Sequence, residues 1–248
     1  MRPSTARRVP TPYDTIAPEY ARHRAGQPFV IEMLRGLHAR AREGAVLEVG
    51  CGTGDYAGAF AERSTSAVYG LDPSREMLRH GARADRLFRV QGHAGSLPFA
   101  DGAFHMIFSV NVIHHLKSVA PYFEESFRAL APGGILCTAT DSEAIIRRRD
   151  PLSRYWPATV PVELERYHRI DDLRAAMAAV GFRDPTACEG RSTFPINDAG
   201  PYRDKAFSCL RLIPEEAFAR GLDAMETDLR AGPLEGASEL VFLWAKRP

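Results

Sequence analysis

The stretch VLEVGCGTGDY, residues 46–56, combines an apolar run, one acidic residue and three glycines at alternate positions. Glycine inside a strand or helix costs about 0.5–1 kcal/mol relative to alanine. Gly50, Gly52 and Gly54 therefore indicate a backbone geometry, or a ligand lying against the backbone, that side chains would prevent. The run predicts a strand, and a helix is expected to open near Thr53, a context in which free backbone N–H groups meet a nucleotide-like ligand.

The next apolar run ends in an aspartate that supports this interpretation. In VYGLDPS, Asp72 follows the glycines at roughly the 20-residue separation at which an acid reaches the hydroxyl pair of a ribose. The alternative for Asp72 is a solvent-facing residue at a strand end. A dinucleotide-binding dehydrogenase would have its third glycine at position 55, where this chain has Asp55. The glycine spacing therefore misses the dinucleotide pattern.

Strands and helices alternate over the first 140 residues. Short apolar runs at 45–49, 67–71, 86–90, 104–110 and 134–140 are separated by helical patterns. Such alternation predicts a parallel sheet covered on both faces. Ligands of these sheets bind outside the carboxyl ends of the strands, so the turns at 92–105 and 111–116 are expected to line one crevice with the glycines.

Further helices and one more strand are predicted from periodicity and capping. One helix is expected from Pro28 to Ala41, another at 119–130, a third at 171–180 with Asp171 as its N-cap and Gly181 at its end, and a fourth at 214–230. Residues 239–245 predict a final strand. Residues 142–170 contain three prolines and many arginines and are interpreted as an irregular insertion between sheet elements.

Composition limits the classes of partner. The 248 residues are 45% hydrophobic and carry 32 basic and 31 acidic side chains, a net charge of +1. The length favours one domain, and the charge balance favours a protein without a nucleic-acid or membrane surface. A monomer or homodimer is expected. The four cysteines have no metal-ligand spacing and are interpreted as reduced thiols of a cytosolic protein. We therefore expect a soluble, cytoplasmic protein with a flexible tail at residues 1–12.

Taken together, the motifs resemble a known family. VLEVGCGTGDY, GLDPSREML, AGSLPFADGAFHMIFSVNVIHHL and RALAPGGILCTA are similar, in order, to the motifs of class I S-adenosylmethionine-dependent methyltransferases, in their small-molecule, type 11-like branch. YDTIAPEYARHR, residues 13–24, resembles the N-terminal signature of that branch. The resemblance implies an α/β, Rossmann-like doubly wound sheet of seven strands in the order 3-2-1-4-5-7-6, with residues 239–245 as the antiparallel seventh strand.

The resemblance also implies the cofactor S-adenosyl-L-methionine and its contacts. The glycines would pass under its amino-acid portion and sugar, Asp72 would hold the ribose hydroxyls, and Asn111 would lie near the sulfonium. Gly95 and Ser96 would sit beside the adenine. No metal is expected. The complete set of expected cofactor contacts is Tyr13, Tyr20, Gly50, Cys51, Gly52, Gly54, Asp72, Pro73, Met77, His93, Ala94, Gly95, Ser96 and Asn111.

At one of these positions the chain departs from the family pattern. Many relatives have an acidic residue before the alanine of the GxA stretch, where it accepts a hydrogen bond from the adenine amino group. This chain has His93. A histidine ring accepts such a bond only through an unprotonated nitrogen, so adenine recognition is expected to depend on pH.

Methyl transfer from a sulfonium mainly requires that the acceptor atom lie in line with the carbon–sulfur bond, with water excluded. His115 is the candidate base for an oxygen or carbon acceptor, the alternative being that it only packs within its turn. Residues 142–170 and 191–210 are interpreted as substrate-cap insertions, and residues 13–24 as a lid over the cofactor, within a single domain at 13–248. A surface helix docked on the sheet is the alternative for the lid.

Three functions remain open at this stage. The favoured one is methylation of a small molecule on oxygen, nitrogen or carbon. A macromolecule methyltransferase is disfavoured by the neutral charge, and the third alternative is a catalytically silent cofactor-binding partner or sensor. Between residues 142 and 170, six arginines stand against four acidic residues. This excess favours a carboxylate or phosphate on the substrate, unless the arginines form a solvated face.

Overall fold

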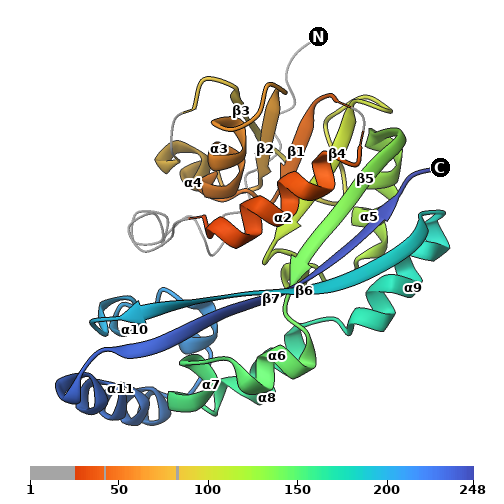
Figure 1. Ribbon diagram of the computed structural model, residues 1–248. Helices are drawn as coiled ribbons and strands as arrows, with labels where there is room; N and C mark the ends of the chain where they lie inside the picture. Colours follow the sequence, from red (N-terminus) through yellow and green to blue (C-terminus); the bar gives the residue numbers. More distant parts are fainter. Residues whose placement is uncertain (1–25, 42, 82–83) are drawn as a thin grey trace, which may run out of the picture.

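The computed structural model describes residues 26–41, 43–81 and 84–248. Seven strands form one sheet in the order β3-β2-β1-β4-β5-β7-β6, which confirms the predicted fold (Figure 1). β1 to β5 run parallel, and β7 is antiparallel to both β5 and β6. The strands are β1 Val46–Val49, β2 Val68–Asp72, β3 Leu87–Gln91, β4 Phe104–Val110, β5 Leu130–Thr140, β6 Arg183–Ile196 and β7 Leu234–Lys246.

Helices cover both faces of the sheet because its central strands are apolar on both sides. In β1, Val46 packs with α2 (Pro28–His38) and α3 (Asp55–Ala61), whereas Leu47 and Val49 belong to the core under α5 (Ala120–Ala129) and α9 (Ile170–Val180). The short helix α4 (Arg75–His80) follows β2, and the 3-10 turn η2 (Ile113–His115) follows β4. Loops and short turns therefore lie at the carboxyl ends of β1, β2 and β4.

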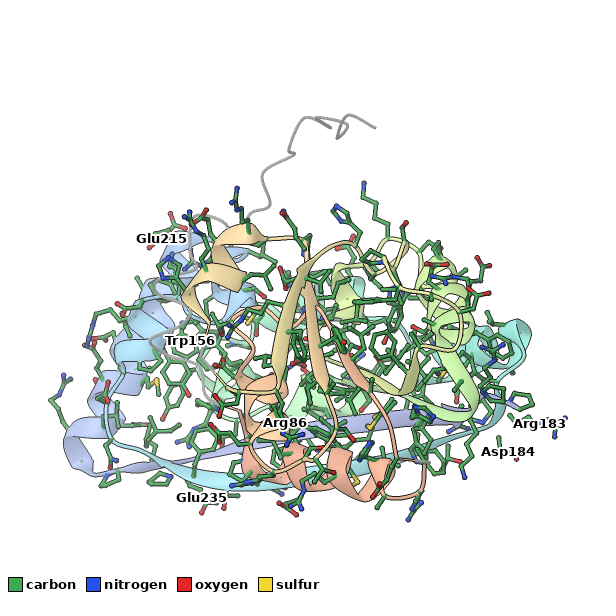
Figure 2. The ribbon with its side chains drawn as sticks, turned by 90° about the horizontal axis from the view of Figure 1, so that it is seen from above. Arg86, Trp156, Arg183, Asp184, Glu215 and Glu235 are labelled. Atoms are coloured by element: carbon green, nitrogen blue, oxygen red, sulfur yellow. The ribbon has the colours of Figure 1, made fainter. Side chains whose placement is uncertain are left out.

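Beyond the carboxyl end of β5, a second group of helices forms a lobe with its own core. We call it the cap lobe. Its elements are α6 (Glu143–Arg148), α7 (Leu152–Tyr155), α8 (Thr159–Arg166), α10 (Gly200–Arg203), η3 (Ser208–Arg211) and α11 (Glu215–Ala231). β6 and β7 continue past the rest of the sheet into this lobe (Figure 1). In Figure 2, Trp156, Glu215 and Glu235 lie at the cap-lobe end of the molecule, opposite Arg183 and Asp184.

Stacked aromatic rings hold the cap lobe together. The Trp156 ring lies between those of Tyr202 and Phe218, at centroid distances of 5.5 and 6.3 Å. Its Nε1 donates a hydrogen bond to the carbonyl oxygen of Phe218 at 2.9 Å. Such a donor needs a partner when it is buried, and Trp156 is only 1% exposed. The indole therefore joins α7, α10 and α11.

The structure corrects the prediction for residues 142–170. They are not irregular, because the segment folds into α6, α7 and α8. Ser142 caps α6 by accepting a hydrogen bond from the Ile145 nitrogen. Pro151 precedes α7 and Pro161 lies in the first turn of α8, where the missing N–H of proline costs no helical bond. The prolines thus separate short helices rather than prevent them.

Several boundaries also differ from the predictions, and β7 begins at Leu234, five residues before the predicted strand. α2 ends at His38, so Ala41 lies outside it. Arg169 is the N-cap of α9, and Asp171 lies in the first turn, where its charge still suits the helix dipole. Residues 191–196 belong to β6 rather than to an insertion, because they pair with β7 along its cap-lobe end.

Among residues 26–41, 43–81 and 84–248, no helix has the length and apolar character needed to span a membrane. All four cysteines are free thiols, three of them buried and Cys188 half-buried.

Candidate functional site

A cavity of about 460 Å³ lies at the carboxyl ends of β1, β2 and β4. We call it the cofactor cavity. Its lining residues are Val49, Gly50, Gly52, Leu71, Asp72, Pro73, Met77, His93, Ala94, Gly95, Val110, Asn111, Val112, His115 and Leu116. The volume falls in the range of ordinary small-molecule sites.

The glycines shape the floor of this cavity. Gly50, Gly52 and Gly54 all have positive φ, of 72°, 54° and 80°. A Cβ atom at Gly50 would lie 2.4 Å from Cγ2 of Val112. The loop therefore requires glycine for its backbone conformation and, at Gly50, for its close approach to the turn after β4.

Asp72 ties this loop to the end of β2. Its Oδ2 accepts a hydrogen bond from the backbone nitrogen of Gly52, and its Oδ1 accepts one from that of Ser74, both at 2.8 Å. Ser74 in turn caps α4 by accepting from the Met77 nitrogen. The carboxylate is 8% exposed and lines the cofactor cavity. It is thus held in a fixed orientation at the cavity wall, and a carboxylate in this position is an acceptor suited to a ligand hydroxyl.

Glu48 is a site residue to which the sequence analysis assigned no role. It is 2% exposed, and its Oε2 accepts from the Ala57 nitrogen in the first turn of α3 at 2.7 Å. Burial raises the pKa of this carboxyl well above its usual range, and the nearby charges of Asp55 and Asp72 act in the same direction. The sequence signal for this role was an acidic residue within the apolar run VLEV, because acidic side chains are rarely buried unless they have a partner.

Two further cavities adjoin the cofactor cavity. The large chamber, of about 370 Å³, extends from the glycine loop to the cap lobe. It is lined by Gln27, Glu48, Gly50, Cys51, Asp55, Tyr56, Val110, Asn111, Pro151, Leu152, Phe194, Pro195, Ile196, Asn197, Asp198, Pro201, Tyr202, Phe207 and Ser238. The small chamber, of about 130 Å³, is lined by Gln27, Asn111, His114, His115, Asp141, Arg149, Leu152, Glu163, Tyr167, Ala206, Phe207, Ser208, Cys209, Arg211, Ser238, Glu239 and Leu240.

Asn111 lies where the three cavities meet. It lines all of them, and it is one of the few residues other than glycine with positive φ, at 55°. Asparagine tolerates this conformation better than most residues. Its backbone nitrogen donates to the Ala139 carbonyl oxygen at 2.9 Å, which keeps the residue beside the end of β5.

His115 lines both the cofactor cavity and the small chamber. The surrounding protein, together with the positive charge of Arg166, lowers the pKa of its imidazole to about 4. The ring is therefore neutral near pH 7 and can accept a proton or a hydrogen bond. The adjacent His114 stacks on Tyr167 with a centroid distance of 4.2 Å, so the insertion after β5 packs directly on η2.

The arginines between residues 142 and 170 are largely engaged by acidic groups of the protein. Arg149 is the most buried of those in ion pairs, and it binds the carboxylates of Asp141 at 2.7 Å and Glu163 at 3.0 Å. Arg166 also binds Glu163, at 2.6 Å. Ion pairs of Arg148, Arg154 and Arg169 lie nearer the surface. Most of these arginines are therefore paired with carboxylates. They form neither a wholly solvated face nor a set of unmatched positive charges.

Nine of the fourteen expected cofactor contacts line the cofactor cavity together. They are Gly50, Gly52, Asp72, Pro73, Met77, His93, Ala94, Gly95 and Asn111. Cys51 faces the large chamber, and Gly54 is the N-cap of α3. Ser96 lies off the cavity and closes a turn by donating from its nitrogen to the His93 carbonyl oxygen at 3.1 Å. Tyr13 and Tyr20 lie outside the described residues, as does the whole predicted lid at 13–24.

The site suits an adenosine-containing ligand and needs no metal ion for this. Asp72 offers a fixed carboxylate for a ribose, the glycine loop leaves room against its backbone, and apolar side chains such as Met77 and Leu116 can flank a base. Within the described part of the chain, no group of three or more histidine, cysteine or acidic side chains is arranged to hold a metal ion.

Comparison with known proteins agrees with this geometry. Residues 47–138 match the family described as "Methyltransferase domain". The chain is 32% identical over 189 residues to malonyl-[acyl-carrier protein] O-methyltransferase of Geobacter sulfurreducens, covering 71% of this chain and 70% of that protein. It is 35% identical over 127 residues to demethylmenaquinone methyltransferase of Anoxybacillus flavithermus, covering 46% of this chain and 52% of that protein.

Among solved structures, phosphoethanolamine N-methyltransferase 2 of Haemonchus contortus has the same fold. The TM-score is 0.58 at 19% identity, over 95% of this chain and 57% of that one. The chain belongs to the class I S-adenosylmethionine-dependent methyltransferases. It is therefore an enzyme whose cofactor is S-adenosyl-L-methionine.

Proposed function

We propose that this methyltransferase acts on a small molecule, which occupies the small and large chambers while the cofactor occupies the cofactor cavity. The observation that carries the proposal is the position of Asn111, which lines all three cavities. An acceptor in either chamber is thereby brought next to the end of the cofactor cavity. A cavity closed on the acceptor side would instead suit a protein that only binds the cofactor.

The names of the relatives support a small acceptor without identifying it. They include methyltransferases of malonyl-acyl carrier protein, demethylmenaquinone and sterols. The Haemonchus structure holds phosphomonomethylethanolamine and S-adenosylhomocysteine. These named acceptors differ in chemistry. The near-neutral net charge of +1 agrees with such a partner better than with nucleic acid.

The roles of the cavity residues follow from their positions. When bound, S-adenosylmethionine supplies an electrophilic methyl group on its sulfonium. We propose that Asp72 accepts from the ribose hydroxyls while Gly50 and Gly52 approach the sugar and amino-acid portion, and that His93, Ala94 and Gly95 flank the adenine. Asn111 lies at the methyl-bearing end. These contacts orient the cofactor, and orientation is the main catalytic contribution of such a site.

His115 is the proposed acceptor-side residue. It lines the boundary between the cofactor cavity and the small chamber, and its neutral imidazole can accept a hydrogen bond from an acceptor hydroxyl. Tyr167, stacked on His114, closes the chamber wall beside it. The cap lobe and the predicted lid would exclude water from the reacting atoms.

The experiment that tests the proposal is a screen of a metabolite library with isotope-labelled S-adenosylmethionine, read by mass spectrometry. A product that has gained one labelled methyl group supports it. Where the acceptor is a hydroxyl, His115→Ala should form this product more slowly than the wild type when both are saturated with cofactor. If the protein binds S-adenosylhomocysteine but labels no small molecule, while histones, ribosomal RNA or a cell lysate become labelled, the acceptor is a macromolecule. Tight cofactor binding with no labelled product of any kind would favour the silent partner or sensor.

A further inference from the structure

The carboxylates that line the small chamber are all bound by arginines. Arg149 holds Asp141 at 2.7 Å and Glu163 at 3.0 Å. Arg148 holds Glu239 at 2.7 Å. Among the described residues of the chamber wall, every negative charge is therefore already matched. A cationic head group entering the chamber would find no unmatched carboxylate to replace its hydration, and burying such a charge unpaired is costly.

The chamber is better prepared for an oxygen that carries negative charge. The Nε–H donor of Arg149 is buried and has no hydrogen-bond partner among the described residues. Burial and the positive charge of Arg166 both hold the pKa of His115 low, and Arg166 lies against Glu163 at 2.6 Å. The charge that acts on the His115 ring is thus the positive one of Arg166, which favours an anionic oxygen there over an ammonium group.

The large chamber has a different character on its cap-lobe side. There most of the wall is apolar or aromatic, beside the polar side chains of Asn197 and Asp198. The apolar and aromatic residues are Pro151, Leu152, Phe194, Pro195, Ile196, Pro201, Tyr202 and Phe207. Phe194 is 39% exposed, unusual for so large an apolar side chain. Leu152 and Phe207 line both chambers and so connect them. One molecule can therefore place a polar head in the small chamber and an apolar body in the large one.

We propose that the acceptor is an amphipathic molecule whose methylated head bears an acidic oxygen, seated in the small chamber beside His115, with its apolar body in the large chamber. A carboxylate, or the hydroxyl of a phenol or enol, meets this description. The inference rests on the proposed function and deepens it by naming the substrate class. In the transfer, an oxygen lone pair forms the new bond to the methyl carbon, and the electron pair of the broken carbon–sulfur bond stays on sulfur. A hydroxyl acceptor gives its proton to the His115 ring, which releases it to solvent.

The weak basicity of His115 also favours this class. A ring with a pKa of about 4 is a poor base for an aliphatic alcohol, whereas an ionised carboxylate needs no base and an acidic phenol or enol needs only a weak one. An amine would be protonated near pH 7, and its ammonium form would have to enter the chamber beside Arg149 and Arg166. The chamber thus disfavours both alternatives.

The test uses three probes with the same eight-carbon chain and different heads: octanoate, octan-1-ol and octylamine. Each is titrated into the full-length protein saturated with S-adenosylhomocysteine, and binding is followed by calorimetry. Octanoate is expected to bind at least about tenfold more tightly than octylamine. Equal affinities, or tighter binding of octylamine, would overturn the proposal. Binding of the three probes in proportion to apolar area alone would overturn it as well.

A matched pair of variants locates the effect. Glu163→Gln removes one carboxylate that competes for Arg149 and Arg166, so octanoate should bind several-fold more tightly to it. Glu143→Gln is the control, because Glu143 is 51% exposed and reaches only Arg169, at 3.9 Å. Its octanoate affinity should equal that of the wild type. If Glu163→Gln weakens octanoate binding although its circular dichroism and melting are native, the small chamber is not the head-group site.

Cofactor binding separates the two hypotheses. S-adenosylhomocysteine affinity is measured first for every variant. A wild-type protein that binds neither S-adenosylhomocysteine nor S-adenosylmethionine contradicts the proposed function itself. A protein that binds the cofactor but shows no preference for octanoate contradicts only the assignment of the acceptor head.

Discussion

The carboxylate of Asp72, at the end of β2, accepts a hydrogen bond at 2.8 Å from the backbone nitrogen of Gly52, twenty residues earlier in the chain. The two residues that the sequence marks separately, an acid at a strand end and a glycine in a loop, are therefore in direct contact. Asp72 has two tasks: it fixes the loop through Gly52 and α4 through Ser74, and it faces the cofactor cavity.

Asp72→Ala is expected to weaken S-adenosylhomocysteine binding by about 1.5–3 kcal/mol, the range for losing hydrogen bonds to a charged group. It should also lower the melting temperature, because two backbone donors lose their partner. Isothermal calorimetry measures the first effect. Asp101→Ala is the control, since Asp101 is 79% exposed and pairs at the surface with Arg128. Unchanged affinity for Asp72→Ala would remove Asp72 from the cofactor site.

Gly50→Ala should damage both folding and cofactor binding. The new methyl group would lie 2.4 Å from Val112, at a residue whose φ is 72°. Together these effects should cost about 1–3 kcal/mol of unfolding free energy and at least about tenfold in S-adenosylhomocysteine affinity. Denaturant unfolding and calorimetry provide the two readings.

The control for Gly50→Ala is the same substitution at Gly36. That glycine lies within α2, and a Cβ there would have nothing within 4 Å. Gly36→Ala should therefore stabilise the protein by about 0.5–1 kcal/mol, because alanine is the better helix former. The interpretation of the glycine loop would be wrong if the two substitutions had similar effects.

The parts of the fold that the sequence predicts are those with local signals. Each of these signals can be read from a few neighbouring residues. They are the apolar runs, the glycines with positive φ, and Gly181, which ends α9 with φ of 111°. β6 has no such signal, because it is an edge strand whose one strand partner in the described sheet is β7, and its sequence RDPTACEGRSTFPI has no apolar run. The length of β6 is determined by its pairing with β7, and this long-range pairing has no local pattern in the sequence.

The candidate site divides in the same way. The glycines and Asp72 were found from their spacing, which follows from one strand–loop–helix unit. The contacts of Arg149 with Asp141 and Glu163 join the end of β5 to α8 and depend on how the cap lobe packs. Among many arginines in one segment, the sequence could not single out the buried one. Glu48 was visible as an acid in an apolar run, but its partner, the Ala57 nitrogen, was not.

Gly221→Ala tests the independence of the cap lobe. A Cβ there would lie 2.3 Å from Nε1 of Trp156, which bridges α7 and α11. Overpacking of this kind costs about 1–3 kcal/mol. We expect methyl transfer to fall sharply while S-adenosylhomocysteine affinity stays within about threefold of wild type, because the glycine loop lies outside this cluster. Equal loss of both would show that the lobe also supports the cofactor cavity.

The low pKa of His115 should affect how the free energy of unfolding depends on pH. Its folded pKa, about 4, lies below the ordinary value of 6.5. Between these values the unfolded chain binds a proton that the native protein does not, so the free energy of unfolding rises with pH across this window and falls as pH drops toward 4. In His115→Gln the slope should be smaller between pH 4.5 and 6.5, as measured by urea unfolding. His80→Gln, at the end of α4, is the control. Identical slopes for wild type and His115→Gln would contradict the shift.

The predicted lid, residues 13–24, lies outside the described residues, which begin at Gly26. Gln27 lines both the large and the small chamber, and its Oε1 accepts a hydrogen bond from Ser238 Oγ at 2.5 Å. Gly26 lies close to the carbonyl oxygen of Asp55, beside the glycine loop. The first described residues, Gly26 and Gln27, therefore lie beside the glycine loop and the two chambers.

If residues 13–24 act as a lid, trypsin should cleave near Arg22 or Arg24 in the free protein, and added S-adenosylhomocysteine should protect these bonds, because ligand orders a segment that closes over it. A chain starting at Gly26 should melt within a few degrees of the full-length protein, since the cores under α2 and α9 are built from the residues that remain. It should bind S-adenosylhomocysteine at least about tenfold more weakly. A chain starting at Pro12, which lacks only the predicted tail, is the control and should bind normally. Should the chain from Gly26 fail to fold, or should trypsin cut equally with and without ligand, these twelve residues belong to the scaffold, and the cap lobe alone must exclude water from the acceptor.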